Sequence, residues 1–214
     1  MTDLKKLYEA ILNGDNKAAL AVTQQAVSEG VEPTELITNH MIPAMSEVGR
    51  RFECEEYYVP ELLLAARAMK GSLEVLRPLL AASGAQPLAR VVIGTVKGDL
   101  HDIGKNLVSS MLEGGGFEVI DLGTDVTPQR FIEAVQAHSA NIVALSALLT
   151  VTMPMMKNTI EALKQASLRD RVKVMVGGAP VTREYADSIG ADGYSETATS
   201  AVTLARQLVA SVAP

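Results

Sequence analysis

VVIGTVKGDLHDIG, residues 91–104, begins with a short run of β-branched apolar residues, which is typical of a strand buried in a parallel sheet. The loop Thr95–Asp102 follows and carries two carboxylates and a histidine. An amphipathic helix then begins near Ile103. The stretch therefore predicts a strand, a loop and a helix, and the loop holds most of the chemistry.

The bulk composition describes an ordinary globular chain. Its 214 residues are 48% hydrophobic and 21% charged, with a net charge of −6, which disfavours nucleic acid or an anionic membrane as a partner. We find no apolar run long enough to span a membrane and no signal-peptide core near the N-terminus, so we expect a cytoplasmic protein. The single cysteine, Cys54, excludes an internal disulfide framework and a cysteine-built zinc site.

The first part of the chain predicts helices only. Asn13-Gly14 and Gly30 interrupt the helical pattern, and Asp15 and Pro33 are suited to helix starts. We expect four helices, near Asp3–Leu12, Asp15–Glu29 and Pro33–Phe52, and a fourth from near Glu56 that ends before Pro78 or just past it. They predict a four-helix bundle as a first domain, residues 1–82. The small, neutral stretch 81–89 then predicts a linker, which we place at residues 83–89.

Residues 90–214 predict a second domain, in which strands alternate with helices. The expected strands are Val91–Gly94, Glu118–Asp121, Ile142–Leu145, Lys173–Val176 and Asp192–Tyr194. The expected helices are Ile103–Glu113, Pro128–His138, Met153–Ala166, Arg183–Ile189 and Glu196–Ala210. This α/β alternation predicts a five-stranded parallel sheet covered on both faces. If the order is flavodoxin-like, the loops Thr95–Asp102 and Ser146–Thr152 converge beyond the carboxyl ends of the first and third strands.

The first of these loops contains Asp99 and His101, two residues apart. In an extended segment such residues project to the same side, so Asp99 can bind one ring nitrogen and leave the other free as a ligand or base. Gly98 and Gly104 flank the pair and suit the close approach of a flat, bulky ligand. The plainer alternative is a solvated histidine on a loop.

Several other chemistries fit poorly. The chain has no GxGxxG or GK[ST] motif for phosphate and no G-x-S-x-G elbow for hydrolysis. Because the third strand ends in Leu145-Ser146-Ala147, without an aspartate, a phospho-acceptor receiver domain is also disfavoured. The second loop, with Ser146, Thr150 and Thr152 between apolar residues, instead predicts a mostly apolar pocket with a few hydrogen-bonding groups.

With these residues, the chain resembles the corrinoid proteins of cobalamin-dependent methyltransferase systems. The D-x-H-x-x-G signature is Asp99, His101 and Gly104. The S-x-L element is Ser146-Ala147-Leu148, and the G-G element is Gly177-Gly178. The three elements follow the expected strands in order, and the helical first domain resembles the cap of that family. The resemblance thus covers nearly the whole chain and implies a flavodoxin-like, Rossmann-like domain behind a four-helix cap.

The resemblance also implies roles for individual residues. His101 would be the lower ligand of cobalt in place of the benzimidazole of cobalamin, and Asp99 and Thr152 would form a relay behind it. The nucleotide tail would extend along Ser146, Leu148, Thr150 and the two glycines, with Ala198 nearby, and Tyr58 would be the cap aromatic. The implied cofactor-binding set is Gly98, Asp99, Leu100, His101, Asp102, Ile103, Gly104, Ser146, Leu148, Thr150, Gly177, Gly178, Ala198 and Tyr58.

The function implied is that of a methyl carrier, a corrinoid subunit that is not a complete enzyme alone. Its partners would be a substrate-specific methyltransferase, a second methyltransferase that uses a folate or a thiol coenzyme, and a reductive activase. Methanol, methylamines, methoxylated aromatics and betaines stay open as methyl donors. Two alternatives also stay open, a cobalamin-binding sensor and the cobalamin subunit of an adenosylcobalamin mutase.

Overall fold

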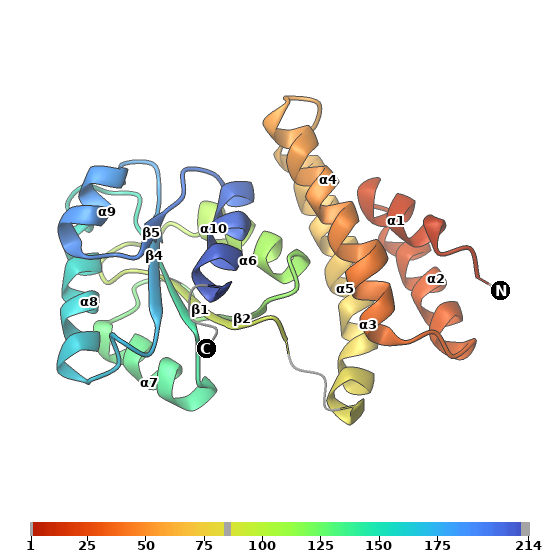
Figure 1. Ribbon diagram of the computed structural model, residues 1–214. Helices are drawn as coiled ribbons and strands as arrows, with labels where there is room; N and C mark the ends of the chain where they lie inside the picture. The colour runs from red at the N-terminus through yellow and green to blue at the C-terminus, as the bar shows by residue number, and fades with distance from the viewer. Residues whose placement is uncertain (1, 84–86, 211–214) are drawn as a thin grey trace. The chain divides into compact units, whose positions relative to one another are not determined.

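A computed structural model describes residues 2–83 and 87–210 of the chain (Figure 1). It divides into two compact units. The helical unit comprises Met1–Leu88 and Ser110–Gly116, and the sheet unit comprises Ala89–Ser109 and Phe117–Pro214. Within the described residues, every helix is too short or too polar to cross a membrane.

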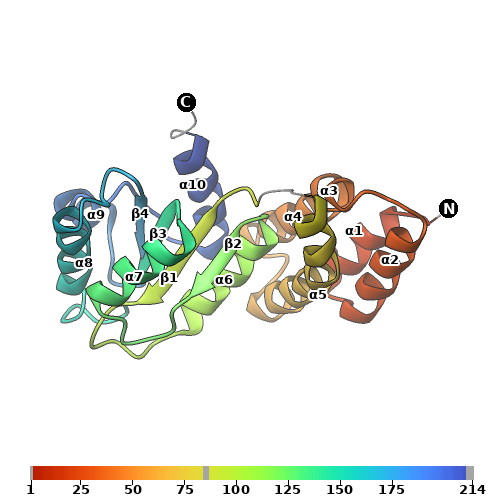
Figure 2. The same ribbon diagram turned by 90° about the horizontal axis from the view of Figure 1, so that it is seen from below.

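The helical unit is built from the helices expected from the sequence, with different bounds. They are α1 (Lys5–Leu12), α2 (Asn16–Ser28), α3 (Pro33–Leu36), the π-helical η1 (Ile37–Met41), α4 (Ile42–Glu53) and α5 (Val59–Ser83). The Asp15 carboxylate caps α2 by accepting a hydrogen bond from the Ala18 N–H at 2.9 Å. Helix α2 packs against both α1 and α5 (Figure 2).

Two helix predictions in this unit were wrong in detail. The single helix expected over Pro33–Phe52 is divided by η1, because Pro43 has no N–H to donate to the preceding turn and the backbone widens there. Helix α5 begins at Val59 rather than Glu56 and continues past Pro78 to Ser83. Residues 81–83 are therefore helix rather than linker, and residues 84–86 of the predicted linker lie outside the described residues.

The sheet unit has the predicted strands in the predicted order. The strands are β1 (Arg90–Thr95), β2 (Glu118–Asp121), β3 (Ile142–Ser146), β4 (Lys173–Gly177) and β5 (Gly193–Tyr194), all parallel and arranged β2-β1-β3-β4-β5. The helices are α6 (Ile103–Gly114), α7 (Pro128–His138), α8 (Pro154–Gln165), α9 (Arg183–Ile189) and α10 (Ala198–Ala210). Figure 1 shows α7, α8 and α9 on one face and α6 and α10 on the other. This arrangement confirms the flavodoxin-like fold.

Strand β1 shows how the opening stretch enters the core. Val91 and Val92 are completely buried. Gly94 leaves room for the ring of Phe131 on α7, since a Cβ there would lie 2.9 Å from Phe131 Cζ. The sequence predicted a strand that ends at Gly94, but in the structure β1 continues to Thr95.

The register brings the predicted loops to one edge of the sheet. Thr95 of β1 is paired with Ser146 of β3, and Ser146 is paired with Gly177 of β4. Gly178 then turns with a φ of +132°, and a Cβ there would lie only 1.9 Å from the Ala147 carbonyl oxygen. Only glycine permits this close approach between the segments that follow β3 and β4.

We expect Gly178→Ala to lower the free energy of unfolding by more than about 2 kcal/mol, because it adds a clash to an unfavourable backbone conformation. Urea denaturation measures this loss. Gly104→Ala is the matched control, since apart from its chain neighbours and the backbone of α6 no atom lies within 4 Å of the added Cβ. A control as unstable as Gly178→Ala would contradict the explanation.

Candidate functional site

The centre of the candidate site is the carboxylate of Asp99, which is completely buried. Its Oδ1 accepts hydrogen bonds from the peptide N–H of His101 at 3.1 Å and from His101 Nδ1 at 2.7 Å. Its Oδ2 accepts from the loop after β3, from Leu148 N at 2.8 Å, Leu149 N at 3.3 Å and Thr152 Oγ1 at 2.7 Å. One side chain thus joins the two loops predicted to converge.

The hydrogen bonds decide the ionisation of Asp99. Burial alone would raise the pKa of this carboxyl group, since it penalises the charged form. The donors from Thr152, Leu148 and His101 outweigh that penalty and hold the pKa of Asp99 well below its usual range. Asp99 is therefore a carboxylate at neutral pH, and it fixes the ring tautomer of His101 with the proton on Nδ1.

His101 is held on one side and open on the other. Its carbonyl oxygen accepts from Thr95 Oγ1 at 2.8 Å, and its Nδ1 donates to Asp99. The side chain is still 50% exposed, and Nε2 has no protein partner among the described residues. A buried carboxylate thus orients an imidazole whose second nitrogen is available to a ligand.

Large apolar side chains are exposed on the same two loops and at the first residue of α6. This apolar patch consists of Leu100, Ile103, Leu148, Leu149 and Val151, which are between 40% and 81% exposed. A cluster of this kind on the loops that carry His101 indicates a binding surface for an apolar ligand. Gly98 and Gly104 leave space beside it: a Cβ on Gly98 would touch only Thr152 Cγ2 at 3.7 Å, and one on Gly104 would touch nothing.

The residues predicted for the nucleotide tail lie partly in this region. Ser146 ends β3 beside Gly177, the last residue of β4, and Gly178 contacts the backbone of Ala147. Thr150 is exposed on the loop, whereas Ala198 is buried at the start of α10. The hydroxyl of Thr197, which precedes Ala198, accepts from the N–H of Ser200 at 3.1 Å.

Two of the predicted residues have partners outside this cluster. The exposed Asp102 accepts from Asn106 Nδ2 at 3.0 Å at the beginning of α6. Tyr58 belongs to the helical unit, where it precedes α5, and it is 64% exposed. Its peptide N–H donates to Glu61 Oε2 at 2.9 Å.

The structure adds residues that the sequence reasoning missed. Lys105 is buried, and its ammonium contacts Asp121 Oδ2 at 2.5 Å and Asn106 Oδ1 at 2.6 Å, which ties the first turn of α6 to the end of β2. Tyr185 Oη donates to the carbonyl oxygen of Met153 at 2.7 Å and so braces the end of the second loop. Asp121 could have been suspected, because it is the last residue of a predicted strand and so lies at the edge where ligands bind.

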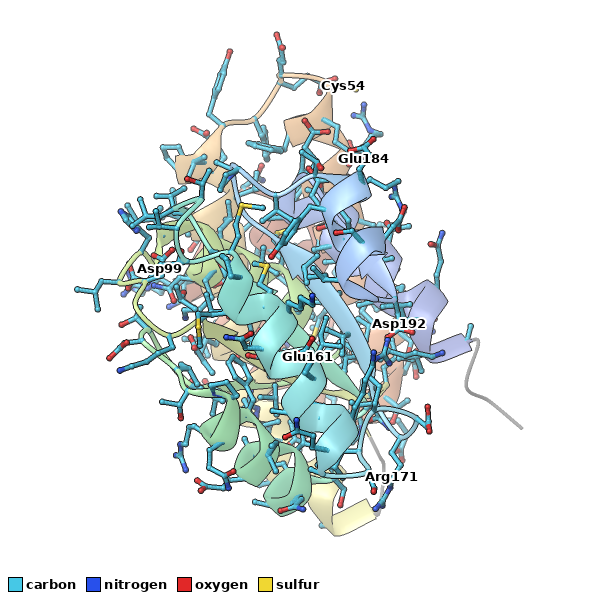
Figure 3. The ribbon with its side chains drawn as sticks, turned by 90° about the vertical axis from the view of Figure 1, so that its left-hand side faces the viewer. Cys54, Asp99, Glu161, Arg171, Glu184 and Asp192 are labelled. Atoms are coloured by element: carbon cyan, nitrogen blue, oxygen red, sulfur yellow. The ribbon has the colours of Figure 1, made fainter. Side chains whose placement is uncertain are left out.

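A hollow of about 410 Å³ lies at the other end of the sheet from Asp99 and His101. It is lined by Lys164, Arg169, Asp170, Val172, Lys173, Gly190 and Asp192. Figure 3 shows Asp99 and Arg171 well apart, near opposite ends of the sheet. Since Arg169 pairs with Asp192 at 2.8 Å, this polar hollow offers little to an apolar ligand. Within residues 2–83 and 87–210, no three His, Cys, Asp or Glu side chains are grouped to hold a metal ion.

Comparison with known proteins agrees with the geometry. Two family profiles, both described as B12 binding domain, match residues 3–77 and 89–203. The chain is 46% identical to the dimethylamine corrinoid protein of Methanosarcina barkeri over 209 residues, 97% of each chain. It is 43% identical to the trimethylamine corrinoid protein 1 of Methanosarcina acetivorans over 208 residues, 96% of each chain.

A solved structure extends the similarity to the fold. The chain resembles one in the crystal structure of the methanol:cobalamin methyltransferase complex of Methanosarcina barkeri. The TM-score is 0.85 at 28% identity, and the match covers 97% of this chain and 80% of that one.

We expect Asp99→Asn to lower the free energy of unfolding by about 1–3 kcal/mol at pH 7, since an amide cannot accept all these hydrogen bonds. The pKa of Asp99 is depressed in the folded state, so its contribution is full above the unfolded value of about 4 and is lost as the pH falls below it. The difference in the free energy of unfolding between wild type and Asp99→Asn should therefore become smaller below about pH 4. Urea denaturation at pH 7 and pH 3 measures it.

The matched control for this prediction is Asp102→Asn. Because Asp102 is exposed and an asparagine oxygen can still accept the bond from Asn106 Nδ2, we expect a change below about 0.5 kcal/mol at both pH values. A difference in unfolding free energy between wild type and Asp99→Asn that is the same at both pH values would contradict the assigned ionisation of Asp99.

Proposed function

Since the chain belongs to the B12-binding family of corrinoid proteins, we propose that it is a methyl carrier that binds cobalamin or a related corrinoid with a histidine as the lower cobalt ligand. The observation that carries this proposal is the Asp99–His101 pair, in which Nε2 is left open beside an apolar patch. We further propose that the chain works in the cytoplasm as a corrinoid subunit and is not a complete enzyme alone.

The residues at the site fit a corrin in three respects. His101 offers one neutral nitrogen, the ligand type that suits cobalt in a macrocycle that already supplies the equatorial nitrogens. The exposed patch Leu100, Ile103, Leu148, Leu149 and Val151 is apolar, as the underside of a corrin requires. Space around Gly98 and Gly104 lets a flat group approach the backbone. The remaining sequence-derived set, Asp102, Ser146, Thr150, Gly177, Gly178 and Ala198, is proposed for the rim and the nucleotide tail.

When bound, the corrin supplies a cobalt that alternates between a nucleophilic reduced form and a methylated form. In this chain, Nε2 of His101 would hold the cobalt. Asp99 holds the ring by its Nδ1 proton, and Thr152 donates to the far oxygen of Asp99, so the three side chains form one hydrogen-bonded chain. With Nε2 unbound, the charged Asp99 would stabilise a second proton on the imidazole.

We propose the chain up to the end of α5 at Ser83 as a cap domain and residues 90–214 as the cobalamin-binding domain, with the linker between them. Tyr58, just before α5, and three residues at the beginning of α5, Val59, Leu63 and Leu64, are exposed apolar side chains that suit a cap that shields a methyl group. Tyr58 is the proposed cap aromatic.

The partners follow from the relatives. The similar chains are named as dimethylamine and trimethylamine corrinoid proteins, so we propose a methylated amine as the methyl donor, loaded by a substrate-specific methyltransferase. A second methyltransferase, dependent on a folate or a thiol coenzyme, would remove the methyl group, and a reductive activase would restore the reduced cobalt. Methyl transfer from mono-, di- and trimethylamine, each with its own methyltransferase, is the assay that identifies the donor.

We expect protein reconstituted with cob(II)alamin to show a histidine nitrogen on cobalt by electron spin resonance with ¹⁵N-histidine labelling. His101→Ala should abolish that coupling and weaken cofactor binding by roughly ten-fold or more, since the lower ligand is removed. His138→Ala, an exposed histidine on α7, is the matched control and should behave as wild type. Coupling only to the benzimidazole nitrogen of the cofactor would refute the ligand assignment.

We expect Asp99→Asn to reduce the fraction of cobalt bound to histidine at pH 7 and to shift the pH at which the ligand is lost. The reason is that the ring loses the carboxylate that fixes its tautomer and orientation, a change that typically costs 10–100-fold in metal affinity. Spin resonance spectra across a pH series measure it. An unchanged titration would show that Asp99 and the ligand are not coupled.

A further inference from the structure

The segment Gly123–Val126, between β2 and α7, runs beside the histidine loop. The N–H of Thr95 donates to the Gly123 carbonyl oxygen at 2.9 Å, and the N–H of Val126 donates to the Thr95 carbonyl oxygen at 2.9 Å. Val96 and Val126 also form an isolated parallel bridge. The segment therefore continues the β1–β2 side of the sheet up to the loop that carries Asp99 and His101.

Asp125 makes the last contacts of this segment. Its Oδ1 accepts from the Gly98 N–H at 2.8 Å, and its Oδ2 accepts from Lys97 Nζ at 2.8 Å. Its own N–H donates to the Asp99 carbonyl oxygen at 2.9 Å. One residue thus binds three consecutive residues of the histidine loop, Lys97–Asp99, which end two positions before His101.

The backbone of Asp125 is unusual in a way that fits such a role. Its φ is +56°, in the left-handed region that non-glycine residues seldom adopt, although aspartate and asparagine tolerate it better than most. This conformation allows the N–H and the carboxylate of one residue to bind the same short segment. The arrangement is maintained although the backbone there is unfavourable for most residues.

From these contacts we propose that Asp125 is a positioning residue that fixes the backbone of Lys97–Asp99 and thereby the orientation of the Asp99–His101 pair. The inference rests on the proposed function, because it concerns how the lower cobalt ligand is held. Asp125 touches neither the imidazole nor the open Nε2, and it acts only through the loop.

Gly98 is the residue whose backbone Asp125 restrains most directly. Its φ is +85°, and glycine has more backbone freedom than any other residue, so the direction in which Asp99 leaves the loop depends on how Gly98 is held. The bond from its N–H to Asp125 Oδ1 restrains that freedom. The Asp99 N–H donates to the Val96 carbonyl oxygen at 3.1 Å, which closes the turn but leaves the Gly98 peptide to Asp125.

For holding the histidine loop, the side-chain oxygen of Asp125 that accepts from Gly98 matters more than the negative charge of Asp125. The ion pair between Lys97 and Asp125 is half exposed on both sides, and such pairs contribute little to stability. The hydrogen bond from the Gly98 N–H, in contrast, holds the backbone itself. An uncharged residue that keeps an oxygen in this place should therefore suffice.

The chain offers matched variants that separate these effects. Asp125→Gly tolerates the positive φ but removes the side-chain acceptor. Asp125→Asn also tolerates the positive φ and keeps a side-chain oxygen. Lys97→Met removes only the ion pair. Two measurements use the cofactor-free protein: the hydrogen-exchange rate of the Gly98 amide and the ring signals of His101 in NMR spectra, assigned with His101→Ala. A third is the fraction of histidine-bound cobalt by spin resonance after reconstitution with cob(II)alamin.

In Asp125→Gly we expect exchange of the Gly98 amide to be at least ten-fold faster, the His101 ring signals to move and the histidine-bound fraction to fall at least two-fold. Asp125→Asn and Lys97→Met should stay close to wild type in all three. Unchanged His101 ring signals and an unchanged histidine-bound fraction in Asp125→Gly would overturn the inference, as would equal effects of Asn and Gly. A wild-type protein without histidine on cobalt would overturn the proposed function instead, and the two measurements on cofactor-free protein would then decide the role of Asp125.

Discussion

The site depends on the hydrogen bonds of the buried Asp99 carboxylate. A charge with no exposure to water is tolerated only if it is fully hydrogen-bonded, and Asp99 meets that condition with donors from both loops. The same bonds keep the group ionised and orient His101. Any change that removes one donor affects the ionisation of Asp99, the position of the second loop and the histidine ring together.

The sheet topology explains why this carboxylate can be satisfied at all. Because β1 and β3 are neighbours and parallel, the residues after both strands emerge at one edge, and Thr152 reaches Asp99 although 53 residues separate them in the chain. Gly178 brings the segment after β4 against Ala147 at the same edge. The site is thus assembled from three segments that share no local sequence.

The loops around His101 combine exposed apolar side chains with a backbone that is held by hydrogen bonds. Five large apolar side chains lie exposed on the two loops and at the start of α6, and their contact with water is unfavourable in the cofactor-free protein. The backbone of the loops is nevertheless held by hydrogen bonds of Thr95, Asp99 and Asp125. A rigid loop with an uncovered apolar surface is the expected design for a large flat cofactor. Little further ordering is then needed when the cofactor binds.

The amino-acid sequence alone determined the local features. β-Branched runs, helix-starting residues and the Asp99-x-His101 spacing identified the strands, most helices and the central pair, because these preferences act between neighbouring residues. Tertiary structure decided the rest: the helix that continues past Pro78, the buried Lys105 and the contacts of Asp125 with the histidine loop. Burial and hydrogen-bond partners come from residues far apart in the chain, so local preference cannot predict them.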